Sequence, residues 1–395
     1  MPGKDRPVIV AAPDSFKGSC SGDDAARAML AGARAVYGDA ADYVAIPLAD
    51  GGEGTLDALL TAWGVEAREA RVHDALGRPR LARYGVSADG ATAMIEAAEA
   101  NGLPWVSDVP LRPLEADSFG VGELVLAALD GGATEILLSV GGSATSEGGT
   151  GILRALGVRF LDAAGAEVAP GAAGLGSIAA IDDSGLDPRA RAATWRIAVD
   201  VGFPLCGPEG AAEVFGPQKG ATPDDVAVID AGLARLAALL AERNGIPATD
   251  YTGRAGFGAA GGIALTAVAL LGAQTIAGAD LVSDAIGLPA LLAETDLVLT
   301  GEGRLDSQSV NGKVVDLVVR TRPTGVPVVV IAGSVALTAA ECRAAGITAA
   351  FSIAPGPTGL PELVAETEDR IAETAAHVAA ILALPPLPAH PPLTA

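Results

Sequence analysis

Residues Asp296–Lys313 read DLVLTGEGRLDSQSVNGK, and this stretch decides what fold we expect. The apolar run Leu297–Leu299 has the character of a strand buried on both faces of a parallel sheet. A polar loop follows it, in which Gly301 and Gly303 are candidate cofactor-binding residues, and a helical run begins near Val314. Because a buried parallel strand can place its chemistry only where it leaves the sheet, this order of elements predicts a ligand site.

The charged side chains of this loop suit a phosphate-bearing ligand. Glu302 and Asp306 carry the carboxylate oxygens that Mg²⁺ prefers. Arg304 and Lys313 would neutralise phosphate oxygens. The alternative is an ordinary solvated connection between a strand and a helix.

Length and composition indicate a soluble α/β protein of more than one domain. The chain has 395 residues, which is too long for one ordinary core, so two domains are expected. Hydrophobic residues make up 50% of it, aromatic residues only 4%, and 51 residues are glycine, a composition typical of this class. The 26 basic and 48 acidic residues give a net charge of −22, which repels nucleic-acid phosphates and anionic lipid. We therefore expect a small-molecule substrate, with no nucleic acid and no membrane as partner.

The cysteines and the N-terminal residues favour a cytoplasmic location. Cys20, Cys206 and Cys342 are far apart and form no CxxC pattern, so neither a zinc site nor a disulfide framework is expected. No signal peptide is expected, since the charged residues 4–6 lead directly into an apolar strand. A reducing compartment suits such a chain.

Two further stretches have an unusual composition. Ala255–Ala279 carries no charged side chain and has the length of a membrane span. Its glycines, with Thr266 and Gln274, instead predict a glycine-rich turn followed by a core helix. Five prolines predict that Pro385–Ala395 is a disordered tail.

The first strand–loop–helix unit starts at the strand Val8–Ala12, which leads into a loop with Ser15 and Lys17. The helix Ala25–Tyr37 follows, after a capping box that begins at Ser21. Such a loop can bind anions, because free backbone N–H groups and the helix dipole point at it. Lys17 adds a full charge, and Ser15 is a candidate cofactor-binding residue. A capped surface loop with a solvated lysine is the alternative.

The second unit runs from the strand Val44–Pro47 through a loop with Asp50 and Glu53 to the helix Leu56–Trp63. The two carboxylates stand among three glycines, so they could hold a metal ion or take a proton. Gly and Asp are also ordinary turn residues. Consecutive βα units place their loops at the same edge of a parallel sheet, which favours a shared site.

From about Arg71 the pattern changes to shorter strands, predicted at Glu69–His73, Leu81–Ser87, Ala93–Glu96 and Glu135–Val140. His73 is expected to be structural. The glycine-rich segment Gly141–Gly151 comes next, before a helix. It can cradle phosphates with backbone N–H groups, although it lacks the lysine of a P-loop and the dinucleotide fingerprint. The cofactor-binding candidates in it are Gly141, Gly142, Ser143 and Thr145. A flexible turn is the alternative.

Asp200 ends another predicted strand, Trp195–Val199, and faces a glycine-rich loop. It is a candidate general base, and a capping or turn role is the alternative. The other predicted elements are the helices Val121–Ala128, Asp224–Asn244 and Glu362–Leu384 and the strands Val326–Ala332 and Ala349–Ile353.

Six motifs together resemble the glycerate kinase family of the bacterial type, whose members phosphorylate D-glycerate with ATP. As they stand here, they are APDSFKGS (Ala12–Ser19), PLADGGEGT (Pro47–Thr55), GGSAT (Gly141–Thr145), VFGPQKGA (Val214–Ala221), GAAGG (Gly258–Gly262) and TGEGRLDSQ (Thr300–Gln308). They follow the family's order over nearly the whole chain, from about Val8 to Leu384.

The resemblance implies two domains with the active site in the cleft between them. One is a doubly wound, flavodoxin- or Rossmann-like α/β domain built from residues 1–70 and 288–384. The other is an inserted mixed α/β domain, residues 71–287. The implied cofactors are ATP and Mg²⁺.

The resemblance also implies roles for the candidate residues. Lys17 and Lys313 would hold phosphate oxygens, and Arg304 would pair with the substrate carboxylate or the transferred phosphoryl group. Asp200 would take the hydroxyl proton. The Mg²⁺ ligands would come from the four acidic candidates, Glu302 and Asp306 with Asp50 or Glu53.

The chain departs from the family pattern in two places. The family usually has Asn-Asp after GGSAT, where this chain has Ser146 and Glu147. It usually has Asn before Pro-Leu, where this chain has Phe203. We interpret Ser146 and Glu147 as polar loop positions with an altered reach, and the lost amide at Phe203 as a change that bears on specificity.

Three functions stay open at this point. The first is a D-glycerate kinase with 2-phosphoglycerate as the favoured product. The second is a kinase for a different small hydroxy acid, and the third is an inactive binding or regulatory homologue. The sequence leaves the oligomeric state open, with a homodimer as one alternative.

Overall fold

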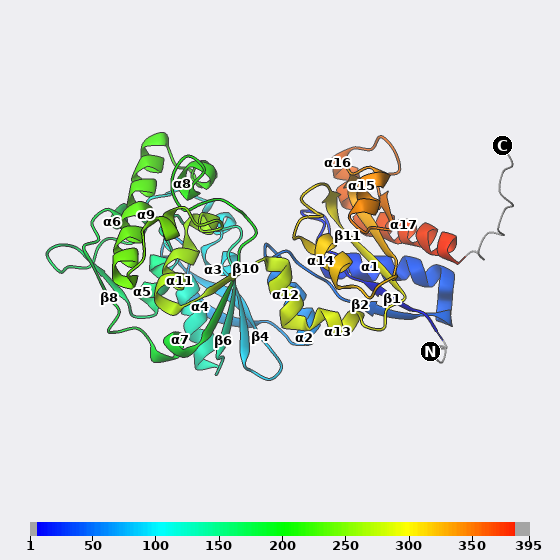
Figure 1. Cartoon of the computed structure of the whole chain (residues 1–395), viewed down its shortest axis with the longest axis horizontal. Coiled ribbons are helices and arrows are strands. Elements are labelled where there is room, and N and C mark those ends of the chain that lie inside the picture. Colours follow the sequence, from blue (N-terminus) through cyan, green and yellow to red (C-terminus); the bar gives the residue numbers. More distant parts are fainter. Residues whose placement is uncertain (1–5, 384–395) are drawn as a thin grey trace. The chain divides into compact units, whose positions relative to one another are not determined.

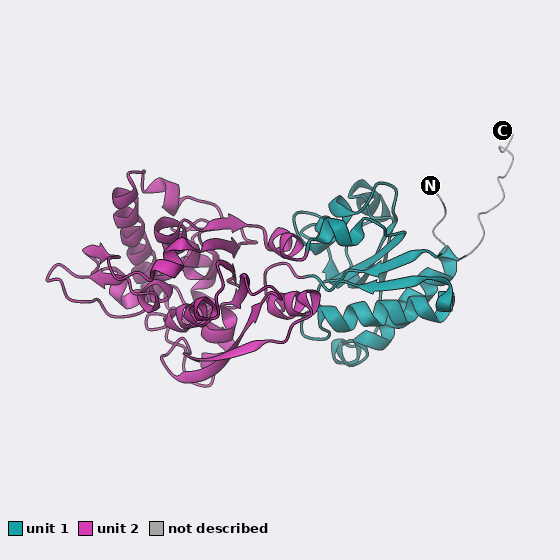
Figure 2. Ribbon diagram, turned by 90° about the horizontal axis from the view of Figure 1, so that it is seen from below, with its two compact units in different colours: residues 1–48, 287–395 teal, residues 49–286 magenta. Residues whose placement is uncertain are grey.

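The structure, a computed structural model, describes residues 6–383. It divides into two compact units, which Figure 2 shows in different colours. Unit 1 comprises residues 1–48 and 287–395, and unit 2 comprises residues 49–286. Residues 49–70, which the sequence places with the chain ends, group here with unit 2. The predicted tail Pro385–Ala395 lies outside the described residues.

Unit 1 is built on a five-stranded sheet whose paired strands all run parallel. The strands are β1 (Val8–Ala11), β2 (Asp42–Ala45), β11 (Leu297–Leu305), β12 (Val328–Val335) and β13 (Ala349–Ser352). They lie in the order β13-β12-β11-β1-β2, which is 2-1-3-4-5 when the strands are numbered along the unit. In this flavodoxin-like order the winding reverses between β1 and β11.

Helices cover both faces of this sheet. They are α1 (Gly22–Tyr37), α13 (Leu288–Leu292), α14 (Val314–Thr321), α15 (Ala339–Ala344), α16 (Leu360–Ala365) and α17 (Thr367–Leu382), with the 3-10 turn η1 (Gly38–Ala40). The helices α1 and α17 pack side by side (Figure 1) over the face that carries Leu299 and Ile331. The helices α14 and α15 contribute to a second core with Val330 and Ala332, which point the other way along β12. The predicted α/β class is confirmed.

Local sequence signals explain where several of these elements begin, and two expectations were wrong. Ser21 caps α1 as predicted, because its hydroxyl accepts a bond of 3.1 Å from the Asp24 amide. The strand expected to end at Leu299 instead continues to Leu305, since its second half pairs with β12 up to Val335. The single helix expected over residues 362–384 is two helices, α16 and α17, because Glu366 leaves the helical conformation at φ −111° and ψ 16°.

Unit 2 contains a six-stranded mixed sheet in the order β10-β9-β6-β5-β4-β3. Its strands are β3 (Arg68–His73), β4 (Pro79–Val86), β5 (Thr92–Glu96), β6 (Glu135–Ser139), β9 (Thr194–Ala198) and β10 (Gln274–Ile276). The four strands from β10 to β5 are parallel, and β4 and β3 are antiparallel to their neighbours. A separate pair is formed by β7 (Arg159–Leu161) and β8 (Ala180–Asp182).

Unit 2 has its own set of helices, and most of them contribute to a large core that includes Ile95, Leu138 and Ile197 of the central strands. They are α2 (Thr55–Trp63), α3 (Ala98–Asn101), α4 (Phe119–Asp130), α5 (Thr150–Ala155), α6 (Ala172–Leu175), α7 (Pro188–Ala192), α8 (Ala211–Phe215), α9 (Pro223–Asn244), α10 (Thr249–Thr252), α11 (Ile263–Leu271) and α12 (Gly278–Ile286), with the 3-10 turns η2 (Leu103–Val106), η3 (Pro217–Lys219) and η4 (Ala259–Gly261). The parallel strands bring the carboxyl ends of β5, β6 and β9 together, because Ser139 pairs with both Glu96 and Ala198.

The uncharged stretch Ala255–Ala279 is broken into η4, the nine-residue core helix α11, β10 and the first turn of α12. The predicted glycine-rich turn and core helix are confirmed. A Cβ atom on Gly261 would lie 2.2 Å from the carbonyl oxygen of Thr145, so the turn packs against another loop where a side chain could not fit. Between residues 6 and 383, no helix is both long enough and apolar enough to cross a membrane.

Candidate active site

One candidate site lies in unit 1, where the winding of the sheet reverses. The loop after β1 runs along the extended end of β11, because the Asp14 amide donates to the Gly301 carbonyl at 2.9 Å. A Cβ atom on Gly303 would lie 3.7 Å from the Lys17 amide nitrogen. The structure thus brings the loop that carries Ser15 and Lys17 next to β11. In open α/β sheets this reversal point forms the ligand crevice.

The charged side chains at this reversal point are largely on the surface. Lys17 is exposed, and no ion pair joins it to another described residue. The Arg304 side chain is 68% exposed, with its Nε 3.5 Å from an Asp306 carboxylate oxygen. Asp306 also accepts a hydrogen bond of 2.9 Å from the Gln308 amide, and Lys313 occupies the N-cap position of α14. Because the side chains of Lys17 and Arg304 are exposed, they can contact an anion that arrives from solvent.

The two glycines predicted to bind a cofactor have different surroundings. Gly301 is buried, and a Cβ atom there would lie 1.9 Å from the Ile331 carbonyl oxygen, so it is needed for the packing of β11 against β12. Gly303 is partly exposed and lets the loop after β1 approach β11. Ser15 is partly exposed, and its amide donates to the Asp14 carboxylate at 2.6 Å.

A separate candidate site lies in unit 2, where three predicted loops converge. A Cβ atom on Gly51 would lie 2.7 Å from Asp200 Oδ2, and one on Gly141 would lie 3.3 Å from the Cα atom of Gly52. Gly51 has a φ of 86°, which favours glycine. The loop of Asp50, the loop of Gly141 and the carboxylate of Asp200 are therefore neighbours within one unit.

Asp200 is held in place by the start of α12. Its Oδ1 accepts a hydrogen bond of 2.7 Å from the Gly278 amide, and a Cβ atom on Gly278 would lie 2.6 Å from Oδ2. The residue as a whole is exposed. The absence of side chains at Gly51 and Gly278 makes room for this carboxylate. Asp200 therefore lies just beyond the end of a strand, as predicted, and its side chain also accepts a hydrogen bond from the first residue of α12, as a capping group does.

The glycine-rich segment after β6 is exposed only at its beginning. Gly141 and Gly142 are exposed, whereas every residue from 143 to 150 is buried. The Thr145 hydroxyl accepts a bond of 3.2 Å from the Asn101 side chain. Ser143 and Thr145 thus have interior side chains, and the part of the segment that can present backbone N–H groups to a ligand is Gly141–Gly142.

Lys219 is a charged residue of this site that the sequence analysis missed. It is 3% exposed, and its ammonium group donates to the Thr145 carbonyl at 2.5 Å and to the Ser143 hydroxyl at 3.5 Å. Burial lowers its pKa to about 7. It lies in one of the recognised motifs, VFGPQKGA, so the motif itself was the signal that could have found it.

The interpretation of Ser146 and Glu147 as polar loop positions was wrong, because both are fully buried. Glu147 accepts hydrogen bonds from the Ser118 hydroxyl at 2.6 Å and from the Gly151 amide at 2.8 Å, and it is also bonded to Thr150. Burial, reinforced by the nearby Asp117 carboxylate, raises the pKa of Glu147 to about 7. This carboxylate holds the start of α5 and does not extend toward solvent.

Glu96 is a second acidic residue that the sequence analysis did not single out. It ends β5, is 7% exposed, and its Oε2 accepts from the Leu56 amide in α2 at 3.1 Å. Burial raises its pKa to about 7. The sequence did contain a signal for Glu96, because it is the last residue of a predicted strand. Asp200 was selected for a similar position, directly after a predicted strand.

The four predicted metal ligands are divided between the units, Asp50 and Glu53 in unit 2 and Glu302 and Asp306 in unit 1. Each pair supplies two carboxylates, and Mg²⁺ is commonly held by one or two carboxylates together with phosphate oxygens and water. The donor chemistry therefore fits Mg²⁺. Within residues 6–383, one group of three side chains that could hold a metal was found, Cys20, Asp24 and Glu368, and it includes none of the four.

Phe203 and His73 both make contacts within the protein. The Phe203 ring packs edge-on against Phe215 at a centroid distance of 5.4 Å. His73 Nδ1 lies 2.9 Å from the Glu123 carboxylate, and the ring stands edge-on to Phe119, which suits the structural role predicted for it. His73 and Phe119 also line a cavity of about 520 Å³ in unit 2, which no predicted site residue lines.

Each unit is an α/β structure whose strand-end loops carry predicted site residues, with cations and carboxylates in unit 1 and glycines and carboxylates in unit 2. The chain belongs to the glycerate kinase family, whose model matches residues 9–383. The recognition of this family from six motifs is thus confirmed, and so is the prediction of an enzyme that transfers a phosphoryl group.

Individual relatives match nearly the whole chain. A glycerate kinase of Bacillus subtilis strain 168 is 41% identical over 377 residues, which are 95% of this chain and 98% of the relative. A glycerate 2-kinase of Escherichia coli strain K12 is 40% identical over 385 residues, with the same two shares. The crystal structure of a Salmonella typhimurium LT2 protein assigned as glycerate kinase 2 superposes with a TM-score of 0.84 at 43% identity, covering 95% of this chain and 98% of that one.

Proposed function

We propose that this protein transfers the γ-phosphoryl group of ATP to a hydroxyl of D-glycerate, with 2-phosphoglycerate as the favoured product and Mg²⁺ as the metal. The observation that carries the proposal is the convergence in unit 2 of the Asp200 carboxylate with the loops of Asp50 and Gly141. It is supported by relatives about 40% identical over nearly their full length, which are named glycerate kinases or glycerate 2-kinase.

The proposed chemistry needs charge neutralisation and in-line positioning more than covalent catalysis. Lys17, Lys313 and Arg304 supply positive charge, with Lys17 and Lys313 on phosphate oxygens and Arg304 on the substrate carboxylate or the transferred group. The exposed amides of Gly141 and Gly142 suit the remaining phosphate oxygens.

Asp200 acts as the general base in this proposal. One carboxylate oxygen is fixed by the Gly278 amide, which orients the group. The carboxylate takes the proton of the attacking hydroxyl as the new P–O bond forms and the bond from the γ-phosphorus to the bridging oxygen of ADP breaks. The candidate Mg²⁺ ligands are Asp50 and Glu53 in unit 2 and Glu302 and Asp306 in unit 1, and the ion would supply charge neutralisation at the phosphates.

We propose a cytoplasmic location, because a reducing compartment suits a chain with free cysteines. The proposed ligands are a small acid and a nucleotide. The three cysteines are free thiols, and burial raises the pKa of Cys20 and of Cys206 to about 12, which makes both poor nucleophiles at neutral pH.

The test is a measurement of ADP release from Mg-ATP with D-glycerate, beside parallel reactions with L-glycerate, tartronate and glycolate. Phosphorus NMR of the product then separates 2-phosphoglycerate from 3-phosphoglycerate. We expect D-glycerate to give the highest kcat/KM and the 2-phosphate. A higher kcat/KM with another acid would overturn the substrate, and no ADP release with any of the four would overturn the proposed reaction.

A further inference from the structure

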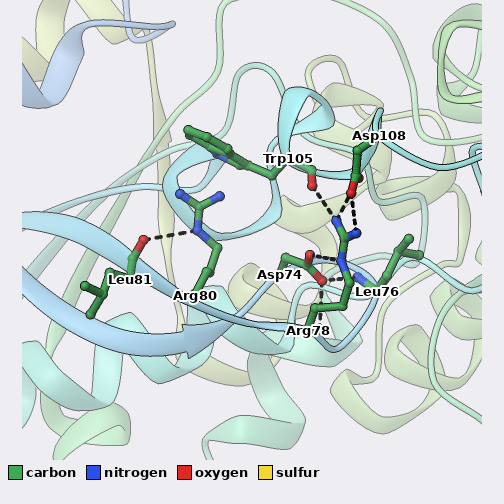
Figure 3. Close-up of polar contacts among 7 residues, drawn as sticks. All are labelled: Asp74, Leu76, Arg78, Arg80, Leu81, Trp105 and Asp108. Atoms are coloured by element: carbon green, nitrogen blue, oxygen red, sulfur yellow. Dashed lines mark hydrogen bonds and ion pairs between the residues drawn. The ribbon is translucent and has the colours of Figure 1, made fainter.

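An exposed aromatic platform stands beside the glycine-rich segment of unit 2. Trp105, on the 3-10 turn η2, is 47% exposed, which is unusual for the largest apolar side chain. The guanidinium carbon of Arg80, on β4, lies 3.8 Å from the centroid of the Trp105 ring system (Figure 3). Stacked tryptophan and arginine side chains are the groups on which proteins stack nucleobases.

The platform is held rigidly by its neighbours. Figure 3 shows the fork of Arg78 clamping the backbone of the turn, with its Nη2 2.5 Å from the Trp105 carbonyl and its Nη1 2.8 Å from Asp108. Arg78 is itself anchored by Asp74 at 2.6 Å. The side chain of Trp105 is fixed as well, because its indole N–H donates to the Ala98 carbonyl at 2.7 Å. A ring fixed in this way loses little conformational freedom when a ligand stacks on it.

Arg80 keeps hydrogen-bonding capacity for a ligand. Its Nε donates to the Leu81 carbonyl at 3.2 Å, and no other hydrogen bond or ion pair joins its side chain to the described residues. The two terminal nitrogens of the guanidinium therefore offer donors that suit ring nitrogens of a purine or oxygens of a ribose.

The platform adjoins the exposed glycines through a few direct contacts. The Leu103 amide, in the same turn as Trp105, donates to the Gly142 carbonyl at 2.9 Å. Gly102 pairs with Ser143, and a Cβ atom on Gly102 would lie 3.0 Å from Trp105 Cδ1. The turn that carries Trp105 and the Gly141–Gly142 backbone are therefore direct neighbours in unit 2.

We propose that Trp105 and Arg80 form the stacking site for the purine base of the nucleotide whose phosphates lie at Gly141–Gly142. The inference rests on the proposed function, since it supplies the base-recognition part of an ATP site. A purine suits this surface because its flat π-face matches the indole and the guanidinium plane, while the adjacent glycines accept the charged end of the same molecule. Trp105 and Arg80 are then nucleotide-binding residues.

The decisive experiment compares base-containing and base-free ligands. Dissociation constants of Mg-ATP, Mg-ADP and tripolyphosphate are measured for the wild type, Trp105→Ala and Trp105→Phe, with steady-state kinetics on the most active acid. We expect Trp105→Ala to weaken both nucleotides roughly five- to a hundredfold while tripolyphosphate binds as before. KM for ATP rises and kcat stays within a few-fold, and Trp105→Phe restores most of the affinity.

Leu81→Ala is the matched control, because Leu81 is a neighbouring side chain, 56% exposed, that offers no stacking plane. It should bind all three ligands as the wild type does. Should Trp105→Ala fail to fold, the indole N–H signals of the wild type give a second test. Only the Trp105 signal should shift with Mg-ADP and not with tripolyphosphate, while those of Trp63 and of buried Trp195 serve as internal references.

Two results would overturn the platform. One is nucleotide affinity that Trp105→Ala leaves unchanged, and the other is an equal loss of tripolyphosphate affinity, which would place the effect in the glycine-rich segment. Both differ from failure of the proposed function, in which the wild type itself neither binds ATP nor releases ADP with any acid.

Discussion

The strand-end loops of unit 1 and of unit 2 use charge in opposite ways. In unit 1 the cations are at the surface, with the Arg304 side chain 68% exposed and Lys17 exposed. In unit 2 the charges at the corresponding loop are inside, since Glu147 of the loop is 0% exposed and Lys219 of η3, which donates to this loop, is 3% exposed. Both loops follow a parallel strand, so this position does not by itself determine which atoms a loop presents to a ligand.

The physical reason for the difference is how deeply each loop is enclosed. The glycine-rich segment of unit 2 is hydrogen-bonded to Asn101, Leu103 and Lys219, and Gly261 packs against it. A buried charge is costly unless it is hydrogen-bonded, so Lys219 and Glu147 bind the segment's own backbone and hydroxyl groups. The unit 1 loop thus exposes cationic side chains, whereas the glycine-rich segment of unit 2 exposes only the anchored backbone of Gly141 and Gly142.

The largest effect is expected at Asp200. In Asp200→Asn the amide oxygen still accepts from Gly278, so the fold is retained, but the base is lost. We expect kcat to fall by about 10³-fold, within the range for removal of a general base. Steady-state kinetics with thermal unfolding measure both properties, and a loss of less than tenfold would leave Asp200 as a cap only.

The second test is Lys17→Ala in unit 1. Because this side chain is exposed, its removal should leave the free energy of unfolding within about 0.5 kcal/mol of the wild type. Activity should fall about a hundredfold, since a phosphate-neutralising charge is lost. Urea unfolding beside kcat/KM for ATP separates the two, and a stability loss without an activity loss would remove the contrast between the units.

Lys219→Met is the reciprocal test in unit 2. The variant leaves the Thr145 carbonyl without its ammonium donor, so we expect a loss of about 2 kcal/mol in the free energy of unfolding. Urea unfolding with the Lys17→Ala protein as reference is the measurement. If Lys219→Met is as stable as the wild type, the ammonium group does not anchor the segment.

The last prediction is a pH dependence of stability caused by Glu147. Its pKa is raised from 4.5 to about 7 in the folded protein, so between these pH values the folded state binds more protons than the unfolded state. Glu147 should therefore lower the stability of the wild type as pH rises through this window, with a contribution of at most about 1.4 kcal/mol per pH unit. Glu147→Gln should remove this contribution, while that of Glu96, whose pKa burial also raises to about 7, remains in both proteins.

Thermal or urea unfolding at pH 4 to 8 measures this slope for both proteins. Outside the window from pH 4.5 to about 7 the two stability curves should run parallel, which serves as the internal control. Curves that stay parallel within the window would show that Glu147 is not the group responsible.

Much of the fold followed from local patterns. Apolar runs such as Leu297–Leu299 marked buried strands, and Ser21 marked the start of α1, because strand burial and helix capping depend on residues close in sequence. The convergence of Asp50, Gly141 and Asp200 in unit 2 had only been suggested by their positions at strand ends.

The sequence by itself determined the α/β class, the order of most elements and the family, because periodicity and motifs are local properties of the chain. Tertiary structure decided the length of β11, the burial of Ser143 and Glu147, and the position of Lys219 beneath a loop about 75 residues earlier in the chain. Exposure and hydrogen-bond partners depend on what distant segments pack against a residue. The same residue type, lysine, is therefore an exposed cation at position 17 in unit 1 and a buried hydrogen-bond donor at position 219 in unit 2.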